Sequence, residues 1–376
     1  MNPFNSEQGF EEFVFTDKDG LANTACVWHG GRFLVMEEGH PPFEVDPLTL
    51  ESLGSFNYGG KLNTAMTAHP KLDPVTGEMV FFAYMGSGPF SSDVIVHKVD
   101  AEGILTESIL VPTPYSSMVH DFVITDNYIV IPVMPITGSL ERAMEGGPPF
   151  AWEPDKGVHI GILPRHGGTA EDVRWLDMDI AFAFHFMNAF DEGGVISVDA
   201  CQMEHAPLFP TPDGGSTGKT EPKLTRWTID MNAAEPRVEF ECIDEFQSEF
   251  PQCDPRFVGQ PYRHGWYTSP DGTLESGMEV NDNFFNTFGH YDHETKSEDR
   301  YSCGQSMVSE ALFVPKSAEA AEGEGYLLAV VTSMETRLSS LYIFNALDLA
   351  SGPLAKAHLS HRVPPGFHGT WRPAGP

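Results

Sequence analysis

Short apolar runs rich in β-branched and aromatic residues recur along the chain, separated by glycine, proline and aspartate. Such runs occupy residues 32–36, 79–84, 94–99, 128–133, 326–331 and 340–344. Turn-forming sequences such as Asp73-Pro74 and Pro270-Asp271-Gly272 lie between them. Many short strands joined by closely spaced turns are typical of all-β proteins. Long helical periodicity is scarce, so the pattern predicts an all-β fold.

The balance of charge is strongly acidic. The 376-residue chain carries 22 lysines and arginines against 54 aspartates and glutamates, a formal net charge of −32. Its apolar content of 41% is ample for a packed core. A charge of this sign repels nucleic acids and anionic membrane surfaces. We therefore expect a small or neutral partner and no nucleic acid, and the oligomeric state is left open.

Three further features favour a cytoplasmic protein. The five cysteines are odd in number and include no Cys-x-x-Cys pair, which argues against a disulfide framework or a cysteine zinc site. The N-terminal sequence has neither a basic start nor an apolar run, so no signal peptide is expected. No stretch approaches the roughly 18 apolar residues of a transmembrane helix, so no integral membrane segment is expected.

Four histidine-containing sequences carry the candidate chemistry. In chain order they are Thr67-Ala68-His69-Pro70, Met118-Val119-His120-Asp121-Phe122, Phe184-His185-Phe186-Met187-Asn188-Ala189 and Phe367-His368-Gly369-Thr370-Trp371. Together they resemble, in the same order, the metal-ligand motifs of the carotenoid cleavage oxygenase family. The sequence around His40-Pro41-Pro42-Phe43 is similar to the bacterial stilbene-cleaving branch. The resemblance extends from about Leu21 to the C-terminus.

This resemblance implies a seven-bladed β-propeller, formed by residues 1–376 as a single domain, with loops and short helices capping one face. It implies one non-haem ferrous ion, Fe(2+), on the propeller axis, bound by His69, His120, His185 and His368. Neutral imidazole suits Fe(II), and four nitrogens on an octahedral ion leave two positions for oxygen or solvent. The other histidines match no ligand motif and are expected to be surface or core residues.

The resemblance also assigns supporting roles to three acids and one threonine. Glu38, Glu249 and Glu310 match the glutamates that orient metal-bound histidines in this family. A carboxylate that accepts the second ring N–H of a ligand histidine fixes the orientation of that ring. Thr24 matches a threonine whose methyl group crowds one open iron position, which would leave a single site for O2.

The candidate ligands and two of the supporting acids are almost evenly spaced. Successive intervals are 51, 65, 64, 61 and 58 residues in the series His69, His120, His185, Glu249, Glu310 and His368. A four-stranded propeller blade needs roughly 40–50 residues, and more where loops are inserted. Each position therefore fits the same place in successive blades, whose inner strands face a common axis.

Two features depart from the family pattern. Stilbene-cleaving relatives usually carry a lysine before the first supporting glutamate, where this chain has Glu37. The Glu37 carboxylate would repel a substrate that carries a phenolate, although it could accept a hydrogen bond from a substrate with a neutral phenol. Relatives also have a substantial segment before Ala22-Asn23-Thr24. We therefore expect an N-terminally short propeller that lacks closing strands and exposes sheet edges.

The resemblance implies an oxidoreductase. The expected reaction is that of a dioxygenase, which cleaves one C=C bond of a conjugated apolar substrate with O2 and gives two aldehyde or ketone products. Stilbenes, related phenylpropenes and apocarotenoids all remain open as substrates. The alternative is a truncated, catalytically impaired propeller that only binds metal. A third alternative is a metal-dependent propeller hydrolase. Calcium prefers oxygen ligands and fits poorly, whereas zinc is not dismissed by residue type.

Overall fold

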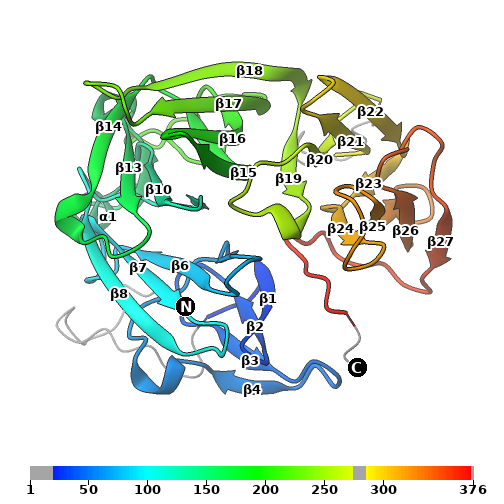
Figure 1. Ribbon diagram of the computed structural model, residues 1–376, viewed down its shortest axis with the longest axis horizontal. Helices are drawn as coiled ribbons and strands as arrows, with labels where there is room; N and C mark the ends of the chain where they lie inside the picture. The colour runs from blue at the N-terminus through cyan, green and yellow to red at the C-terminus, as the bar shows by residue number, and fades with distance from the viewer. Residues whose placement is uncertain (1–19, 274–284, 374–376) are drawn as a thin grey trace.

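A computed structural model describes residues 20–273 and 285–373 of the chain. These residues form antiparallel sheets that follow one another around a ring in chain order (Figure 1). Six sheets have four or five strands each, so the described residues contain six blades. The all-β propeller is confirmed, whereas the predicted number of seven blades is wrong for this part of the chain. The single domain over residues 1–376 stays a prediction, because it takes in residues outside the described ranges.

The first three blades take up the chain as far as Met178. Blade 1 contains β1 (Ala25–His29), β2 (Arg32–Met36), β3 (Phe43–Val45) and β4 (Ser52–Ser55). Blade 2 contains β5 (Lys71–Leu72), β6 (Met79–Tyr84), β7 (Asp93–Val99) and β8 (Leu105–Pro112). Blade 3 contains β9 (Val123–Ile124), β10 (Tyr128–Val133), β13 (Val158–Pro164) and β14 (Arg174–Met178).

The remaining blades follow in the same way. Blade 4 has the longest inner strand and contains β15 (Phe182–Glu192), β16 (Val195–Met203), β17 (Lys223–Asp230) and β18 (Val238–Gln247). Blade 5 contains β19 (Glu249–Cys253), β20 (His264–Ser269), β21 (Thr287–Asp292) and β22 (Ser297–Ser302). Blade 6 contains β23 (Ser306–Val308), β24 (Leu312–Pro315), β25 (Gly325–Ser333), β26 (Ser339–Asn345) and β27 (Ala355–His358).

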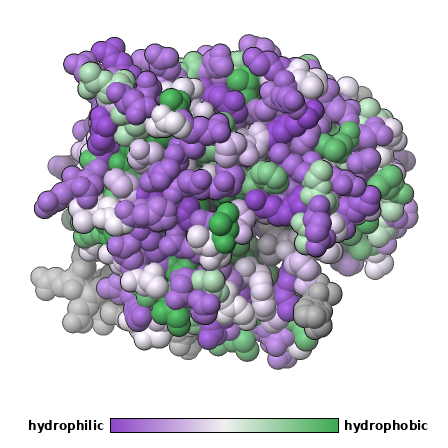
Figure 2. Space-filling model, viewed as in Figure 1, coloured by the Kyte–Doolittle hydropathy of each residue, from purple (hydrophilic) through white to green (hydrophobic). Residues whose placement is uncertain are grey.

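Within residues 20–273 and 285–373, helical structure is confined to short pieces. An excursion from blade 3 between β10 and β13 holds β11 (Ile136–Gly138), α1 (Leu140–Met144), β12 (Phe150–Trp152) and η4 (Pro154–Lys156). Three more 3-10 turns are η3 (Tyr58–Gly60), η5 (Ala170–Asp172) and η6 (Pro255–Phe257). No helix in the described part of the chain is long and apolar enough to cross a membrane. The face seen in Figure 2 is mostly hydrophilic, with hydrophobic residues scattered over it.

The burial of individual strands follows their place in a blade. β6, the second strand from the axis in blade 2, is buried at every position from Met79 to Ala83, as expected for a strand covered on both faces. The outer strand β8 instead alternates between buried and exposed positions (Figure 1). The apolar cores lie between neighbouring blades, where for example Ile160 of β13 and Val198 of β16 belong to one buried cluster. This arrangement leaves the centre of the ring for polar side chains.

The chain beyond β27, here called the C-terminal segment (residues 359–373), forms no strand. It passes from blade 6 to blade 1 (Figure 1). Its Val363 N–H donates to Ser339 Oγ at 2.8 Å, and its His368 N–H donates to the Thr24 carbonyl at 3.0 Å. His368, the last residue of the nearly even series that begins at His69, therefore lies on a segment without a sheet of its own. The even spacing reflects residues placed around the axis and does not give the number of sheets.

Candidate metal centre

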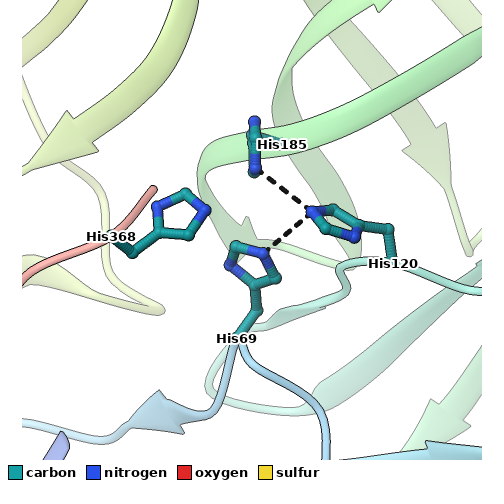
Figure 3. Close-up of side chains that lie close together, drawn as sticks. All are labelled: His69, His120, His185 and His368. Carbon is teal, nitrogen blue, oxygen red and sulfur yellow. Dashed lines mark hydrogen bonds between the residues drawn. The ribbon is translucent and has the colours of Figure 1, made fainter. Parts of the chain in front are cut away.

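The four predicted ligands meet at the centre of the ring, although each comes from a different part of the chain (Figure 3). His69 and His120 lie just before β5 and β9, His185 lies on β15, and His368 lies on the C-terminal segment. One ring nitrogen from each histidine lies within 4.8 Å of the others. The Nε2 atoms of His69 and His120 are 3.0 Å apart, and those of His120 and His185 are 3.2 Å apart.

The outer nitrogens of three of these rings contact the three predicted glutamates. Nδ1 of His120 contacts Glu38. Nδ1 of His185 lies 2.5 Å from Glu249 Oε2, and Nδ1 of His368 lies 2.9 Å from Glu310 Oε1. The two members of each pair come from different segments of the chain, so each pair holds two segments together at the axis. The structure thus brings the seven predicted histidines and glutamates to one place.

The ring nitrogens are arranged as a bound cation requires. Because Nδ1–H donates to a glutamate, the Nε2 atom that faces the axis carries a lone pair. Two lone pairs 3.2 Å apart, on His120 and His185, repel each other unless a cation lies between them. Nitrogen ligands about 2.1 Å from a metal and at right angles are about 3.0 Å apart. The observed separations of 3.0 and 3.2 Å match that value.

Local backbone structure aims His185 at the axis. The pairing of β15 with β16 shifts register between Ala183 and Phe186 and again between Phe186 and Asn188. A bulge of this kind re-aims a side chain while the strand continues. The His185 ring packs against Phe250, with ring centroids 5.3 Å apart and planes at 27°. Phe250 has a φ of +49°, which is uncommon for an aromatic residue.

Burial and neighbouring charges shift the pKa values of this cluster. Burial, and then the positive charges of the other histidines, hold the pKa of His69 well below its usual range. Burial lowers the pKa of His185 by more than the Glu249 carboxylate raises it. Burial alone would raise the pKa of Glu249, but His185 and the Phe250 N–H outweigh it, so the pKa is lowered. A neutral imidazole beside an ionised carboxylate is the protonation state that metal binding needs.

His120 differs from the other three histidines in its titration. Burial lowers its pKa, but the Glu38 carboxylate outweighs burial, and the pKa is raised above the usual value. Glu38 itself also accepts from Tyr84 Oη at 3.5 Å.

Thr24 and Glu37, the two predicted catalytic residues, lie at the edge of this arrangement. The Thr24 carbonyl accepts from His368 N–H, and its hydroxyl donates to Asn23 Oδ1 at 3.2 Å. Glu37 Oε1 lies beside Gly20, where an added Cβ would come within 2.9 Å of it. Among the described residues, no hydrogen bond or ion pair joins Glu37 to the histidine cluster. The catalytic roles of both residues stay predictions.

Several contacts of the cluster were not predicted from the sequence. Gln252 Nε2 donates to Glu310 Oε1 at 2.6 Å. Phe184 packs edge-on against His120, with ring centroids 5.3 Å apart. Phe184 directly precedes His185, and that adjacency is a signal the sequence did contain. Gln252 has no such signal, because its contact with Glu310 spans 58 residues.

A cavity of about 260 Å³ opens beside the cluster. Its wall includes three ligand candidates and several polar side chains, among them His69, His185, His368, Lys71, Asp121 and Gln252. A second cavity of about 410 Å³ lies between blade 6 and the C-terminal segment. Phe367 and Trp371, on its wall, are about half exposed.

Comparison with known proteins identifies the family. A family profile described as retinal pigment epithelial membrane protein (RPE65) matches residues 1–373. The chain is 38% identical to lignostilbene-alpha,beta-dioxygenase isozyme III of Sphingomonas paucimobilis over 94% of the chain and 75% of that protein. It is 35% identical to isoeugenol monooxygenase of Pseudomonas putida over 99% of the chain and 78% of that protein.

Solved structures agree with the sequence matches. The crystal structure of Pseudomonas brassicacearum lignostilbene dioxygenase superposes with a TM-score of 0.91 at 34% identity, covering 96% of this chain and 77% of that one. Cobalt-substituted Synechocystis ACO superposes with a TM-score of 0.81 at 26% identity, covering 98% and 78%. The resemblance drawn from the four histidine motifs is confirmed: the chain belongs to the RPE65/carotenoid oxygenase family and is an oxidoreductase of the dioxygenase type.

Proposed function

We propose that the protein is a non-haem Fe(II) dioxygenase that cleaves one C=C bond of a conjugated apolar substrate. The carbon–carbon double bond breaks, and each carbon takes one atom of O2, so that two aldehydes or ketones form. The observation that carries the proposal is the convergence of four histidine nitrogens within 4.8 Å, with three glutamates on the outer nitrogens.

The protein's own residues have distinct tasks in this proposal. His69, His120, His185 and His368 hold the metal, and bound ferrous iron supplies the electron-transfer chemistry that O2 needs. Glu38, Glu249 and Glu310 fix the rings and offset the charge of the cation. The methyl group of Thr24 would crowd one open coordination position of the iron.

Two aromatic rings beside the histidine cluster are evidence for the proposal that the substrate is conjugated and apolar. Phe184 packs against the His120 ring, and Phe250 packs against the rings of His185 and His368. Aromatic faces beside the metal exclude water and offer stacking partners to a planar alkene. The named activities of the relatives, on lignostilbene and isoeugenol, favour a stilbene or a phenylpropene over an apocarotenoid.

Glu37 bears on the choice between these substrates. The pKa of the Tyr84 hydroxyl is raised by burial and then by the Glu38 carboxylate. The Glu37 carboxylate lies close enough to Tyr84 to raise this pKa further. A site with two adjacent carboxylates disfavours a phenolate and accepts a hydrogen bond from a neutral phenol. We therefore propose that Glu37 selects against substrates bound as the phenolate.

The decisive experiment measures products and metal together. Iron-loaded protein is incubated in air with a hydroxylated stilbene, isoeugenol and an apocarotenal, and a parallel reaction uses ¹⁸O₂. We expect two carbonyl products, each with one labelled oxygen, and one iron per chain. Protein that binds no stoichiometric iron would overturn the proposal. Stoichiometric zinc that excludes iron would favour the hydrolase instead.

The second candidate function is a metal-binding propeller without turnover. Oxygen-dependent cleavage by the wild type that vanishes in His185→Ala would exclude this candidate. Glu37→Lys then tests substrate choice, because it restores the cation of stilbene-cleaving relatives. We expect faster turnover of the hydroxylated stilbene relative to isoeugenol. An unchanged ratio would remove Glu37 from the explanation.

A further inference from the structure

Asp121 directly follows His120, and its buried carboxylate is shared by three segments of the chain. The side chain is only 2% exposed. Oδ1 accepts a hydrogen bond from Lys71 Nζ at 2.7 Å and from the Phe122 N–H at 2.8 Å. Oδ2 accepts from the Phe186 N–H at 3.1 Å. Hydrogen bonds to an ionised acceptor are about twice as strong as bonds between neutral groups.

Each donor lies close to a histidine of the metal centre. Lys71 comes two residues after His69, and Phe186 comes one residue after His185. Asp121 itself is covalently joined to the third histidine. One carboxylate therefore links the segments that carry three of the four candidate ligands, across three successive blades, through one lysine side chain and two backbone N–H groups.

The bond to Phe186 falls at the irregular part of β15. The pairing of β15 with β16 shifts register on either side of this residue. Where a ladder is disrupted, a backbone N–H benefits from an acceptor outside the sheet. Asp121 provides that acceptor, so it fixes the bulge that aims His185 at the axis.

The bond to Lys71 serves the one ligand candidate without a glutamate. Among the described residues, no carboxylate is bonded to the ring of His69, whereas the other three rings each contact one. The segment that carries His69 is held instead by the Lys71–Asp121 ion pair, whose lysine is 17% exposed. The ammonium group also keeps the buried carboxylate from being an uncompensated charge.

We propose that Asp121, balanced by Lys71, is a positioning residue that sets His69, His120 and His185 at metal-binding separation. This inference rests on the proposed metal site. It assigns to Asp121 a task distinct from that of the three glutamates, because Asp121 fixes backbone segments whereas the glutamates fix rings.

The test measures cobalt(II) binding by the full chain, because cobalt reports on ligand geometry through its visible absorption. Asp121→Asn keeps the size and one acceptor but loses the charge and the second acceptor. We expect its Kd for cobalt to rise about 10–100-fold, the range typical of outer partners of a metal site. We also expect its visible bands to shift. Lys71→Gln, a milder change, should raise the Kd for cobalt and shift the visible bands in the same direction but by less. It replaces Asp121→Asn as the test variant if Asp121→Asn does not fold.

Asp199→Asn is the matched control. Asp199 is 1% exposed and pairs with Arg226 at 2.7 Å, but it contacts none of the four histidines. We expect it to lower the Tm and leave cobalt affinity and spectrum unchanged. Wild-type affinity and spectrum in both Asp121→Asn and Lys71→Gln would overturn the inference, as would an equal loss in Asp199→Asn. A wild type that binds no cobalt and no iron would overturn the metal site itself, which separates the two failures.

Discussion

Among the described residues, histidine rings meet at two places, and one of these places has the features of a metal centre. At the axis, four rings direct a nitrogen toward a common point. In blade 5, His264 Nδ1 lies 3.0 Å from His290 Nε2, and both residues are buried. The distances between ring nitrogens are the same in the two places, so distance alone does not identify a site.

The difference lies in the outer nitrogens. At the axis, carboxylates take the Nδ1–H of His120, His185 and His368, so lone pairs face one another and a cation is needed between them. In blade 5 the two rings share one hydrogen bond with each other, and in the described part of the chain no hydrogen bond or ion pair joins either ring to a carboxylate. The His290 ring also stacks on Trp266, with centroids 5.6 Å apart and planes at 21°. The blade 5 pair therefore has the character of core packing.

The largest expected effect separates the two clusters by metal content. His185→Ala removes one of four nitrogen donors and leaves Glu249 buried without its partner. We expect stoichiometric iron binding and turnover to be lost. His264→Ala should keep one iron per chain and lower only the Tm. Metal analysis after dialysis against ferrous salt under argon checks both variants. Iron retained by His185→Ala, or lost by His264→Ala, would reverse the assignment.

The second expected effect is acid sensitivity of the blade 5 pair. Burial, and then the charge of His264, lower the pKa of His290 to about 4. The unfolded chain has a histidine pKa of about 6.5. The folded state therefore disfavours protonation of His290. The stability contributed by the neutral His290 ring is fully present above pH 6.5 and is lost as the pH falls toward 4, because the unfolded chain takes up the proton first. By linkage this contribution is on the order of 3 kcal/mol.

Urea denaturation of metal-free protein at pH 7 and pH 5 measures this effect. His290→Phe keeps an aromatic ring on Trp266 but removes the titration. We expect the loss of stability between the two pH values to be smaller in His290→Phe than in the wild type. The axial histidines titrate in both proteins, so the difference between the proteins isolates blade 5. Equal losses would show that His290 does not disfavour its proton.

Part of this contrast was predictable from the sequence. The runs at residues 32–36, 79–84 and 128–133 coincide with β2, β6 and β10, because turn residues bound each run on both sides. The four ligand candidates were found because local motifs flank them. Because no motif surrounds His264 and His290, both were expected to be surface or core residues, and the structure buries both.

What could not be predicted depends on closure of the ring. The number of blades was overestimated because seven was taken from the family resemblance, whereas the described residues form six sheets of four or five strands and His368 lies on a segment without a sheet. Asp121 was missed because its partners Lys71 and Phe186 lie 50 and 65 residues away in the chain. In a chain with 54 acidic residues, composition gives no means of choosing the carboxylates that meet a histidine.

The smallest expected effect concerns the carboxylates that distinguish the clusters. Glu249 is bonded to the His185 ring at 2.5 Å, whereas Glu322 accepts the backbone N–H groups of Arg263 and His264 and has no hydrogen bond or ion pair to a histidine ring among the described residues. Glu249→Gln keeps an acceptor for Nδ1–H but loses the charge that makes the imidazole a better donor to metal. We expect the Kd for cobalt to rise by about 10-fold, the lower end of the usual range.

Glu322→Gln provides the comparison, since it makes the same replacement of a carboxylate by an amide, but beside the His264–His290 pair of blade 5. It should lower the Tm slightly and leave the Kd for cobalt unchanged, because its bonds are to backbone N–H groups at 2.6 and 2.9 Å. If the two variants weakened cobalt binding equally, the effect would come from net charge and not from ring orientation. A weaker Kd in Glu249→Gln alone would establish that a carboxylate on the outer nitrogen separates a ligand histidine from a packed one.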